Sequence, residues 1–145
     1  MLPISPAIFQ GPPDGPVRDE IKTILVVEDS ADTRDVLIQT LWGYGHRVFT
    51  AKNGEEAIRV ARRARPDLII MDLNMPVLDG LAATERIRRE PVVGRVPILA
   101  ITAYDTFGMR EATLEAGCDE YLCKPLDFAE FEKVVADLLL ADSVR

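Results

Sequence analysis

The sequence has one histidine and two cysteines among its 145 residues, and this scarcity excludes several kinds of chemistry. With His46 alone, a Ser-His-Asp triad has little to work with. A zinc site needs about four ligands, and Cys118 and Cys123 have no second cysteine pair or histidine cluster nearby. We therefore expect both thiols to be small buried or half-buried side chains in a reducing compartment.

Long apolar runs and basic blocks are also missing from the sequence. No stretch approaches the length of a membrane span, and the N-terminus lacks the charged segment and apolar run of a signal peptide. The net charge is −7, and basic residues cluster only in pairs such as Arg62-Arg63 and Arg88-Arg89. A nucleic-acid-binding face needs concentrated positive charge. We expect a cytoplasmic protein that binds neither membranes nor nucleic acids.

Proline divides the chain into a tail and a domain. Residues 1–20 contain five of the ten prolines, which is typical of an extended tail. We predict a tail over residues 1–21, a single domain over 22–141 and a short C-terminal tail over 142–145. The alternative for the first tail is that Ile4, Ile8 and Phe9 dock onto the domain or a partner.

Within the domain, short apolar runs alternate with segments of helical periodicity. We predict strands over residues 24–27, 47–50, 68–71, 96–101 and 119–123. We predict helices that begin near Ser30, at 53–54, near 80, near 107 and near 126. Val36, Leu37 and Leu41 lie at helical spacing in the first helix, and Ser30 is its predicted N-cap.

This alternation predicts an α/β fold. Strands that alternate with helices form a parallel sheet covered on both faces, and right-handed crossovers with short loops favour the doubly wound arrangement. In such sheets, ligands bind beyond the carboxyl ends of the strands. The residues that follow each predicted strand are therefore the candidates for a functional site.

Complementary polar residues follow four of the predicted strands. Glu28 and Asp29 follow the first strand, Asp72 the third, Thr102 the fourth and Lys124 the fifth. Three carboxylates at one edge repel one another unless a cation lies between them, and Mg²⁺ prefers such oxygen ligands. A lysine and a hydroxyl suit phosphate oxygens. Together they predict a site for a phosphoryl group with a carboxylate as nucleophile.

The runs ILVVEDS, LIIMDLNMPVLDG, ILAITA and YLCKP resemble the receiver domain of bacterial two-component response regulators. The spacings agree as well, with thirty positions from Asp72 to Thr102 and twenty-two from Thr102 to Lys124. The resemblance covers residue 22 to about residue 140. It implies a flavodoxin-like fold of five parallel strands and five helices, in the strand order 2-1-3-4-5 of the family's chemotaxis member.

The resemblance also implies a role for each site residue. Asp72 would accept a phosphoryl group from a histidine kinase or a histidine phosphotransfer protein. Glu28, Asp29, Asp72 and the backbone carbonyl of Asn74 would hold Mg²⁺. Lys124 would bind a phosphoryl oxygen. Glu28 replaces the commoner aspartate, and its longer arm would act through water.

Further implied roles concern switching and hydrolysis. Thr102 would move to bind a second phosphoryl oxygen, Tyr121 would then rotate inward, and the Lys124-Pro125 bond would be cis. Tyr104, beside Asn74, would control how readily water reaches the phosphoaspartate. The alternative for Tyr104 is a surface side chain without kinetic effect.

We therefore predict a stand-alone response regulator that signals through a phosphorylation-dependent protein-binding surface. The chain ends about twenty residues after Lys124, so we expect no output module, and the downstream partner is unknown. We expect no enzyme activity beyond assistance to its own phosphorylation and dephosphorylation. One alternative is a magnesium-dependent aspartyl phosphatase, although Asn74 stands where haloacid-dehalogenase-like phosphatases usually have a second aspartate. The other is a phosphorylation-independent docking module, against which the complete set of acids, threonine and lysine argues.

Overall fold

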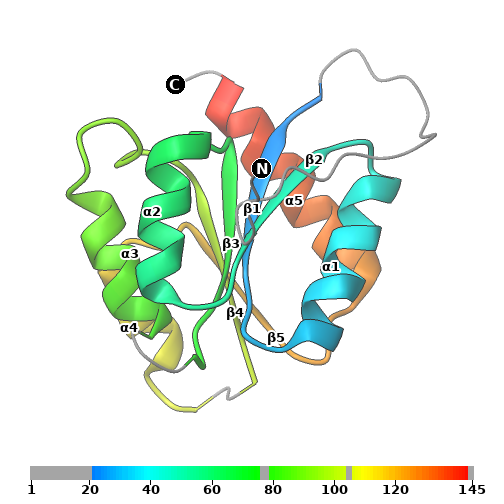
Figure 1. The fold of residues 1–145 in the computed structure, drawn as a ribbon. Coiled ribbons are helices and arrows are strands. Elements are labelled where there is room, and N and C mark those ends of the chain that lie inside the picture. Colours follow the sequence, from blue (N-terminus) through cyan, green and yellow to red (C-terminus); the bar gives the residue numbers. More distant parts are fainter. Residues whose placement is uncertain (1–20, 76–78, 104–105, 144–145) are drawn as a thin grey trace.

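The computed structural model describes residues 21–75, 79–103 and 106–143. The predictions for the tail over residues 1–20 and for Tyr104 fall outside these residues and remain predictions. The described elements alternate along the chain (Figure 1): β1 (Thr23–Val27), α1 (Ala31–Gly43), β2 (Arg47–Ala51), α2 (Gly54–Ala64), β3 (Leu68–Asp72), α3 (Gly80–Arg88), β4 (Ile98–Thr102), α4 (Met109–Ala116), β5 (Glu120–Cys123) and α5 (Phe128–Ser143).

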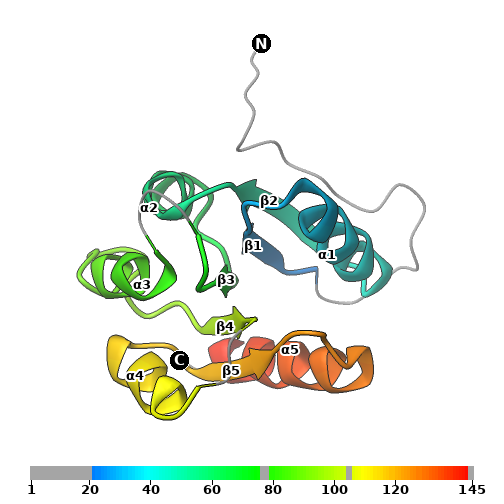
Figure 2. The ribbon, with the colours of Figure 1, turned by 90° about the horizontal axis from the view of Figure 1, so that it is seen from below.

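The strands form one parallel sheet in the order β2-β1-β3-β4-β5, which confirms the predicted fold class and strand order. Figure 2 looks along the sheet and shows its three layers. Helices α1 and α5 cover one face, and α2, α3 and α4 cover the other. A parallel sheet buried on both faces needs apolar residues throughout its strands. All five residues of β3 and of β4 are indeed buried.

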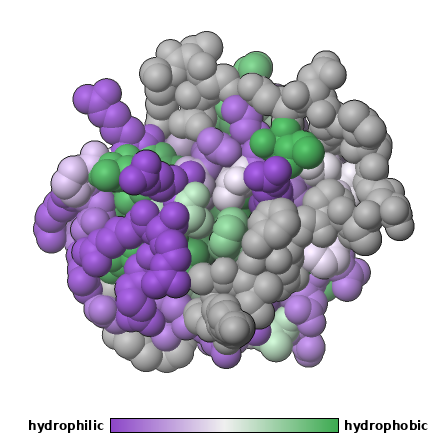
Figure 3. All heavy atoms as spheres, turned by 45° about the horizontal axis from the view of Figure 1, so that its top comes forward, coloured by the Kyte–Doolittle hydropathy of each residue, from purple (hydrophilic) through white to green (hydrophobic). Residues whose placement is uncertain are grey.

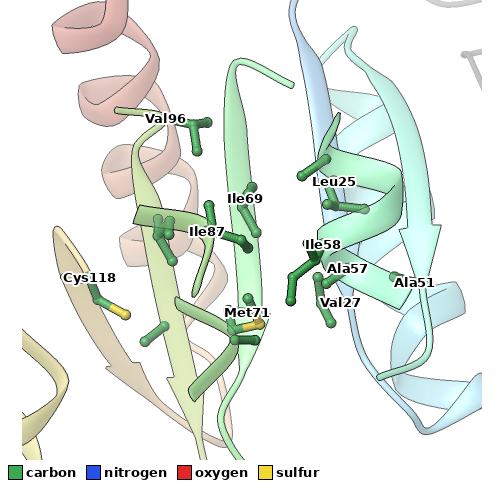
Figure 4. Close-up of a cluster of buried hydrophobic side chains, with 14 of the residues drawn as sticks. Leu25, Val27, Ala51, Ala57, Ile58, Ile69, Met71, Ile87, Val96 and Cys118 are labelled. Carbon is green, nitrogen blue, oxygen red and sulfur yellow. The ribbon is translucent and has the colours of Figure 1, made fainter. Parts of the chain in front are cut away.

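Alternate strand residues supply the two halves of the core. Leu25, Val27, Ile69 and Met71 point toward the α2 and α3 side, where Ile58 and Ile87 pack against them (Figure 4). The intervening residues contribute to a second cluster under α1 and α5, whose largest fully buried side chain is Phe131. This alternation follows from the two-residue period of a strand.

Side chains at the helix ends fix where several helices begin. Ser30 accepts a hydrogen bond from the Thr33 N–H, which confirms it as the N-cap of α1. Asn53 caps α2 in the same way through the Glu56 N–H. These contacts satisfy backbone donors that have no partner within the helix. Asp127, which was not predicted as a cap, accepts from the Ala129 and Glu130 N–H groups at the start of α5.

Some predicted details are wrong. Strand β4 begins at Ile98 and not at Val96, whose N–H bonds back to the Val93 carbonyl in a turn. Helix α4 begins at Met109, after Gly108 in the left-handed region (φ 82°). Val36 is 51% exposed, so α1 packs on the sheet through Leu37, Ile38 and Leu41 instead.

The outer faces of the helices are mostly polar. Figure 3 brings the top of Figure 1 forward, and hydrophilic side chains gather on its left, the side of α2 and α3. Two ion pairs join these helices, Arg62 with Glu90 just beyond α3 and Arg86 with Glu55. Among residues 21–75, 79–103 and 106–143, no helix is both long enough and apolar enough to cross a membrane.

Candidate functional site

The strand ends bring the predicted site residues to one edge of the sheet, which we call the carboxyl edge. In the strand register, Val27 pairs with Met71, Asp72 with Ile101, and Thr102 with Cys123. The strands therefore finish almost level with one another. The residues that end or follow them, Glu28, Asp72, Thr102 and Lys124, meet at this edge. Figure 2 views the molecule from the end where the strands finish.

Three acids lie close together at this edge. Glu28, Asp29 and Asp72 each offer one carboxylate oxygen, and these three oxygens lie within 4.8 Å of one another. Glu28 is 2% exposed and Asp72 is 3% exposed, whereas Asp29 is exposed. The cluster thus has a buried inner side and one solvent-facing member.

Lys124 is the cation that faces the two buried acids. Its Nζ lies 3.3 Å from Glu28 Oε1 and 3.7 Å from Asp72 Oδ2. The neighbouring strand β4 holds its backbone in place, since the Lys124 N–H donates to the Thr102 carbonyl at 2.8 Å. The Lys124-Pro125 bond that follows is cis, as the resemblance implied.

A single lysine does not balance the negative charge of the cluster. Burial raises the pKa of Glu28 from 4.5 to about 7, and the neighbouring Asp72 contributes through its charge and a hydrogen bond. The Ser30 backbone and Lys124 act in the opposite direction on this pKa and do not cancel the increase. The protein by itself therefore leaves the site with an excess of negative charge.

Backbone amides orient the two buried carboxylates. Glu28 Oε2 accepts from the Ser30 N–H at 3.2 Å, and Asp72 Oδ1 accepts from the Asn74 N–H at 2.9 Å. Each acid is therefore held by the amide two residues further along its own loop. Their other oxygens, Glu28 Oε1 and Asp72 Oδ2, face Lys124.

The site residues fit a hard divalent cation. They offer clustered carboxylate oxygens in a setting whose negative charge is not balanced, and such ions bind oxygen ligands by preference. Asn74 follows Asp72 by two residues, and its carbonyl remains a predicted ligand.

The two predicted switch residues lie on neighbouring strands. Thr102 is fully buried, and its hydroxyl donates to Asn74 Oδ1 at 3.1 Å. Tyr121 is only 6% exposed and belongs to the core cluster on the α2–α4 side. The Arg110 guanidinium from α4 lies over its ring, 6.0 Å from the centroid. The aromatic ring already lies inside the protein in this structure.

Two residues that support the site were not singled out from the sequence. A Cβ on Gly80 would lie 2.6 Å from the Asp72 carbonyl oxygen and 2.8 Å from Leu73 Cα, so α3 approaches the end of β3 closely only because this residue is glycine. Arg34 Nη1 donates to the Glu28 carbonyl at 2.9 Å. In the sequence, the Asp79-Gly80 pair at a helix start could have pointed to Gly80. Arg34 carries no such signal, because it looks like any exposed helix residue.

Comparison with known proteins identifies the class of protein that this fold and site define. Residues 24–136 match the family model described as the response regulator receiver domain, and the chain belongs to that family. It is a receiver domain of the kind found in two-component systems.

Individual relatives differ in how much of their length the chain covers. The "Probable transcriptional regulator ycf27" of Pyropia yezoensis is 37% identical over 85% of this chain but only 49% of its own length. The chain thus spans about half the length of this and several similar curated relatives. The "Polar-differentiation response regulator DivK" of Brucella anthropi is 30% identical over 81% of this chain and 96% of its own length.

A solved structure of a receiver domain shares the fold of this chain. It is the receiver domain of the sensor histidine kinase PA1611 from Pseudomonas aeruginosa, with a TM-score of 0.77 and 40% identity over 83% of this chain and 98% of that chain. That structure has a magnesium ion coordinated in its active site cleft.

Proposed function

We propose that this domain is a phosphorylation-dependent signalling switch whose phosphoryl acceptor is Asp72. The observation that carries the proposal is the position of Lys124 Nζ, 3.3 Å from Glu28 and 3.7 Å from Asp72 at the carboxyl edge. A lysine so placed meets the oxygens of a phosphoryl group on Asp72 without a large movement. Membership of the receiver family supports this assignment.

The donor is a phosphohistidine of a histidine kinase or a histidine phosphotransfer protein. A carboxylate oxygen of Asp72 attacks the phosphorus atom, and the new P–O bond forms as the P–N bond breaks. The electron pair of that bond returns to the imidazole nitrogen of the donor. The product is an acyl phosphate on Asp72, and positioning with charge neutralisation supplies most of the catalysis.

Glu28, Asp29, Asp72 and the Asn74 carbonyl would hold Mg²⁺, which neutralises charge on the phosphoryl oxygens when bound. Lys124 neutralises a further oxygen. Backbone amides keep the two buried acids in fixed orientations, because the Ser30 and Asn74 N–H groups each hold one carboxylate oxygen. The end of a rigid buried strand then presents the nucleophile in one orientation.

Phosphorylation adds about two negative charges and three acceptor oxygens at the end of β3. Thr102 binds one of these oxygens, and the β4–α4 segment adjusts with it. Tyr121 lies beneath α4, so this adjustment changes the surface formed by α4, β5 and α5. A downstream protein that binds this surface better in one state shifts the balance between the states.

The test is phosphorylation by a small-molecule phosphodonor, followed by intact mass measurement with and without Mg²⁺. We expect the wild-type protein to gain one phosphoryl group in a metal-dependent manner and Asp72→Asn to gain none. Asp67→Asn is a matched control, since Asp67 lies at the opposite end of the same strand. Metal-dependent phosphorylation that persisted in Asp72→Asn would refute the assignment.

A further inference from the structure

The side chain of Asn74 joins the loop after β3 to the loop after β4. Its Oδ1 accepts a hydrogen bond from the Thr102 hydroxyl at 3.1 Å and another from the Ala103 N–H at 3.1 Å. Thr102 is fully buried, whereas Asn74 and Ala103 are exposed. One side-chain oxygen thus holds two successive residues at the end of β4.

The direction of these bonds follows from their chemistry. A backbone N–H can only donate, so the Asn74 atom that faces Ala103 must be the amide oxygen and not the amide nitrogen. The same oxygen faces the Thr102 hydroxyl, which must therefore donate to it. A hydroxyl has one proton, and in this structure Thr102 directs that proton toward Asn74.

We infer that Asn74 is a positioning residue that competes with the phosphoryl group for the Thr102 hydroxyl. This inference rests on the proposed function. In the resting domain, Asn74 holds Thr102 and Ala103 at the carboxyl edge. When Asp72 is phosphorylated, the Thr102 proton passes from the Asn74 oxygen to a phosphoryl oxygen.

This exchange sets how strongly the domain favours its phosphorylated conformation. A hydrogen bond to a charged oxygen is stronger than one to a neutral amide, so the exchange is favourable. The net gain in free energy is smaller than that of the new bond alone, because the hydrogen bond from Thr102 to Asn74 is lost.

A double-mutant cycle separates the competition from other effects of Asn74. The four proteins are wild type, Asn74→Ala, Thr102→Val and the double variant, and the measurement is the affinity for beryllofluoride with Mg²⁺, a phosphoryl mimic. Thr102→Val keeps the shape of the side chain and removes its hydroxyl. Asn74→Ala keeps the backbone carbonyl that is proposed to bind metal.

We compare the change in mimic affinity that Asn74→Ala causes in two backgrounds. With Thr102 present, we expect this change to be about three- to tenfold more favourable than in the Thr102→Val background. This range corresponds to the net worth of one neutral hydrogen bond. An equal effect of Asn74→Ala in both backgrounds would overturn the inference, because the two residues would then act independently.

A second measurement needs no phosphoryl group or mimic. Hydrogen exchange of the Ala103 amide in the resting protein should be faster in Asn74→Ala and unchanged in Thr102→Val. Unchanged exchange in Asn74→Ala would also overturn the inference. Failure of Asp72 to accept a phosphoryl group would refute the proposed function and leave this exchange result intact.

Asn53→Ala is the matched control for both measurements. Its Oδ1 also accepts a backbone N–H, that of Glu56 at 2.9 Å, but at the start of α2. We expect this variant to lower stability without changing mimic affinity or Ala103 exchange. A similar effect from Asn53→Ala would show that loss of any such cap perturbs the site, and it would overturn the specific role of Asn74.

Discussion

Carboxylates lie at both ends of this sheet, and they have opposite surroundings. At the end where the strands begin, the amino edge, Asp67 accepts from the Thr23 N–H of the neighbouring strand at 2.8 Å. Asp119 does the same for Ile98 at 2.8 Å and also accepts from Arg88 at 2.9 Å. At the carboxyl edge, Glu28 and Asp72 crowd one another around a single lysine.

The difference shows how one residue type serves two purposes in one fold. The amino-edge acids satisfy backbone donors on adjacent strands, so they lock the strand register. The carboxyl-edge acids accept from amides in their own loops, and Glu28 also accepts from Lys124; burial beside Asp72 makes the charged form of Glu28 costly. We infer that the amino edge stabilises the fold, whereas the crowded carboxyl edge suits the cation and the phosphoryl group that are proposed to bind there.

The largest effect on stability should come from the amino edge. Asp119→Ala removes the acceptor of the buried Ile98 N–H and the ion-pair partner of Arg88, so we expect a loss of about 2 to 4 kcal/mol in unfolding free energy. Asp72→Ala should change it by less than about 1 kcal/mol without metal, because it also relieves repulsion. Urea denaturation measures both, and equal losses would remove the distinction between the edges.

Close packing at the carboxyl edge should make Gly80 intolerant of a side chain. Gly80→Ala places a Cβ against the Asp72 carbonyl and the Leu73 backbone, so we expect a loss of about 1 to 3 kcal/mol. Gly43→Ala is the matched control, since no atom lies within 4 Å of its added Cβ and alanine favours a helix. Thermal midpoints compare the two, and a similar response at both positions would contradict the close approach.

A third substitution, at Glu28, should have the opposite sign. The raised pKa of Glu28 means that the folded protein binds its proton more tightly than the unfolded chain. The stability that protonated Glu28 contributes is complete below its ordinary pKa near 4.5 and is lost as the pH rises through about 7. Without metal at pH 8, Glu28→Gln should therefore stabilise the domain by about 1 to 2 kcal/mol.

The gain from Glu28→Gln should shrink as the pH falls from 8 to 5 and should also shrink when Mg²⁺ is added to the wild type. Denaturation curves at several pH values, with and without Mg²⁺, measure this. A Glu28→Gln protein less stable than the wild type at pH 8 would show that the crowded carboxylates are not under electrostatic strain.

Much of this architecture could be predicted from the sequence because its signals are local. Apolar runs such as LIIM mark strands buried on both faces, and Ser30 and Asn53 mark helix starts through contacts within one turn. The acids, Thr102 and Lys124 were identifiable because each one ends or follows a strand of a parallel sheet. The error at Val36 arose where helical spacing alone does not say which stripe of the helix faces the core.

The sequence by itself determined the order of elements, the class of fold and the residue types at the carboxyl edge, since these depend on periodicity, caps and strand ends. Only the tertiary structure decided which groups touch. The Asn74 oxygen meets Thr102 and Ala103 across 28 and 29 residues, and Lys124 meets Glu28 across 96. Such contacts depend on how strand ends are registered against one another, and the energy of a buried charge depends on its surroundings. Neither these contacts nor these energies can be predicted from the residues that are adjacent in the sequence.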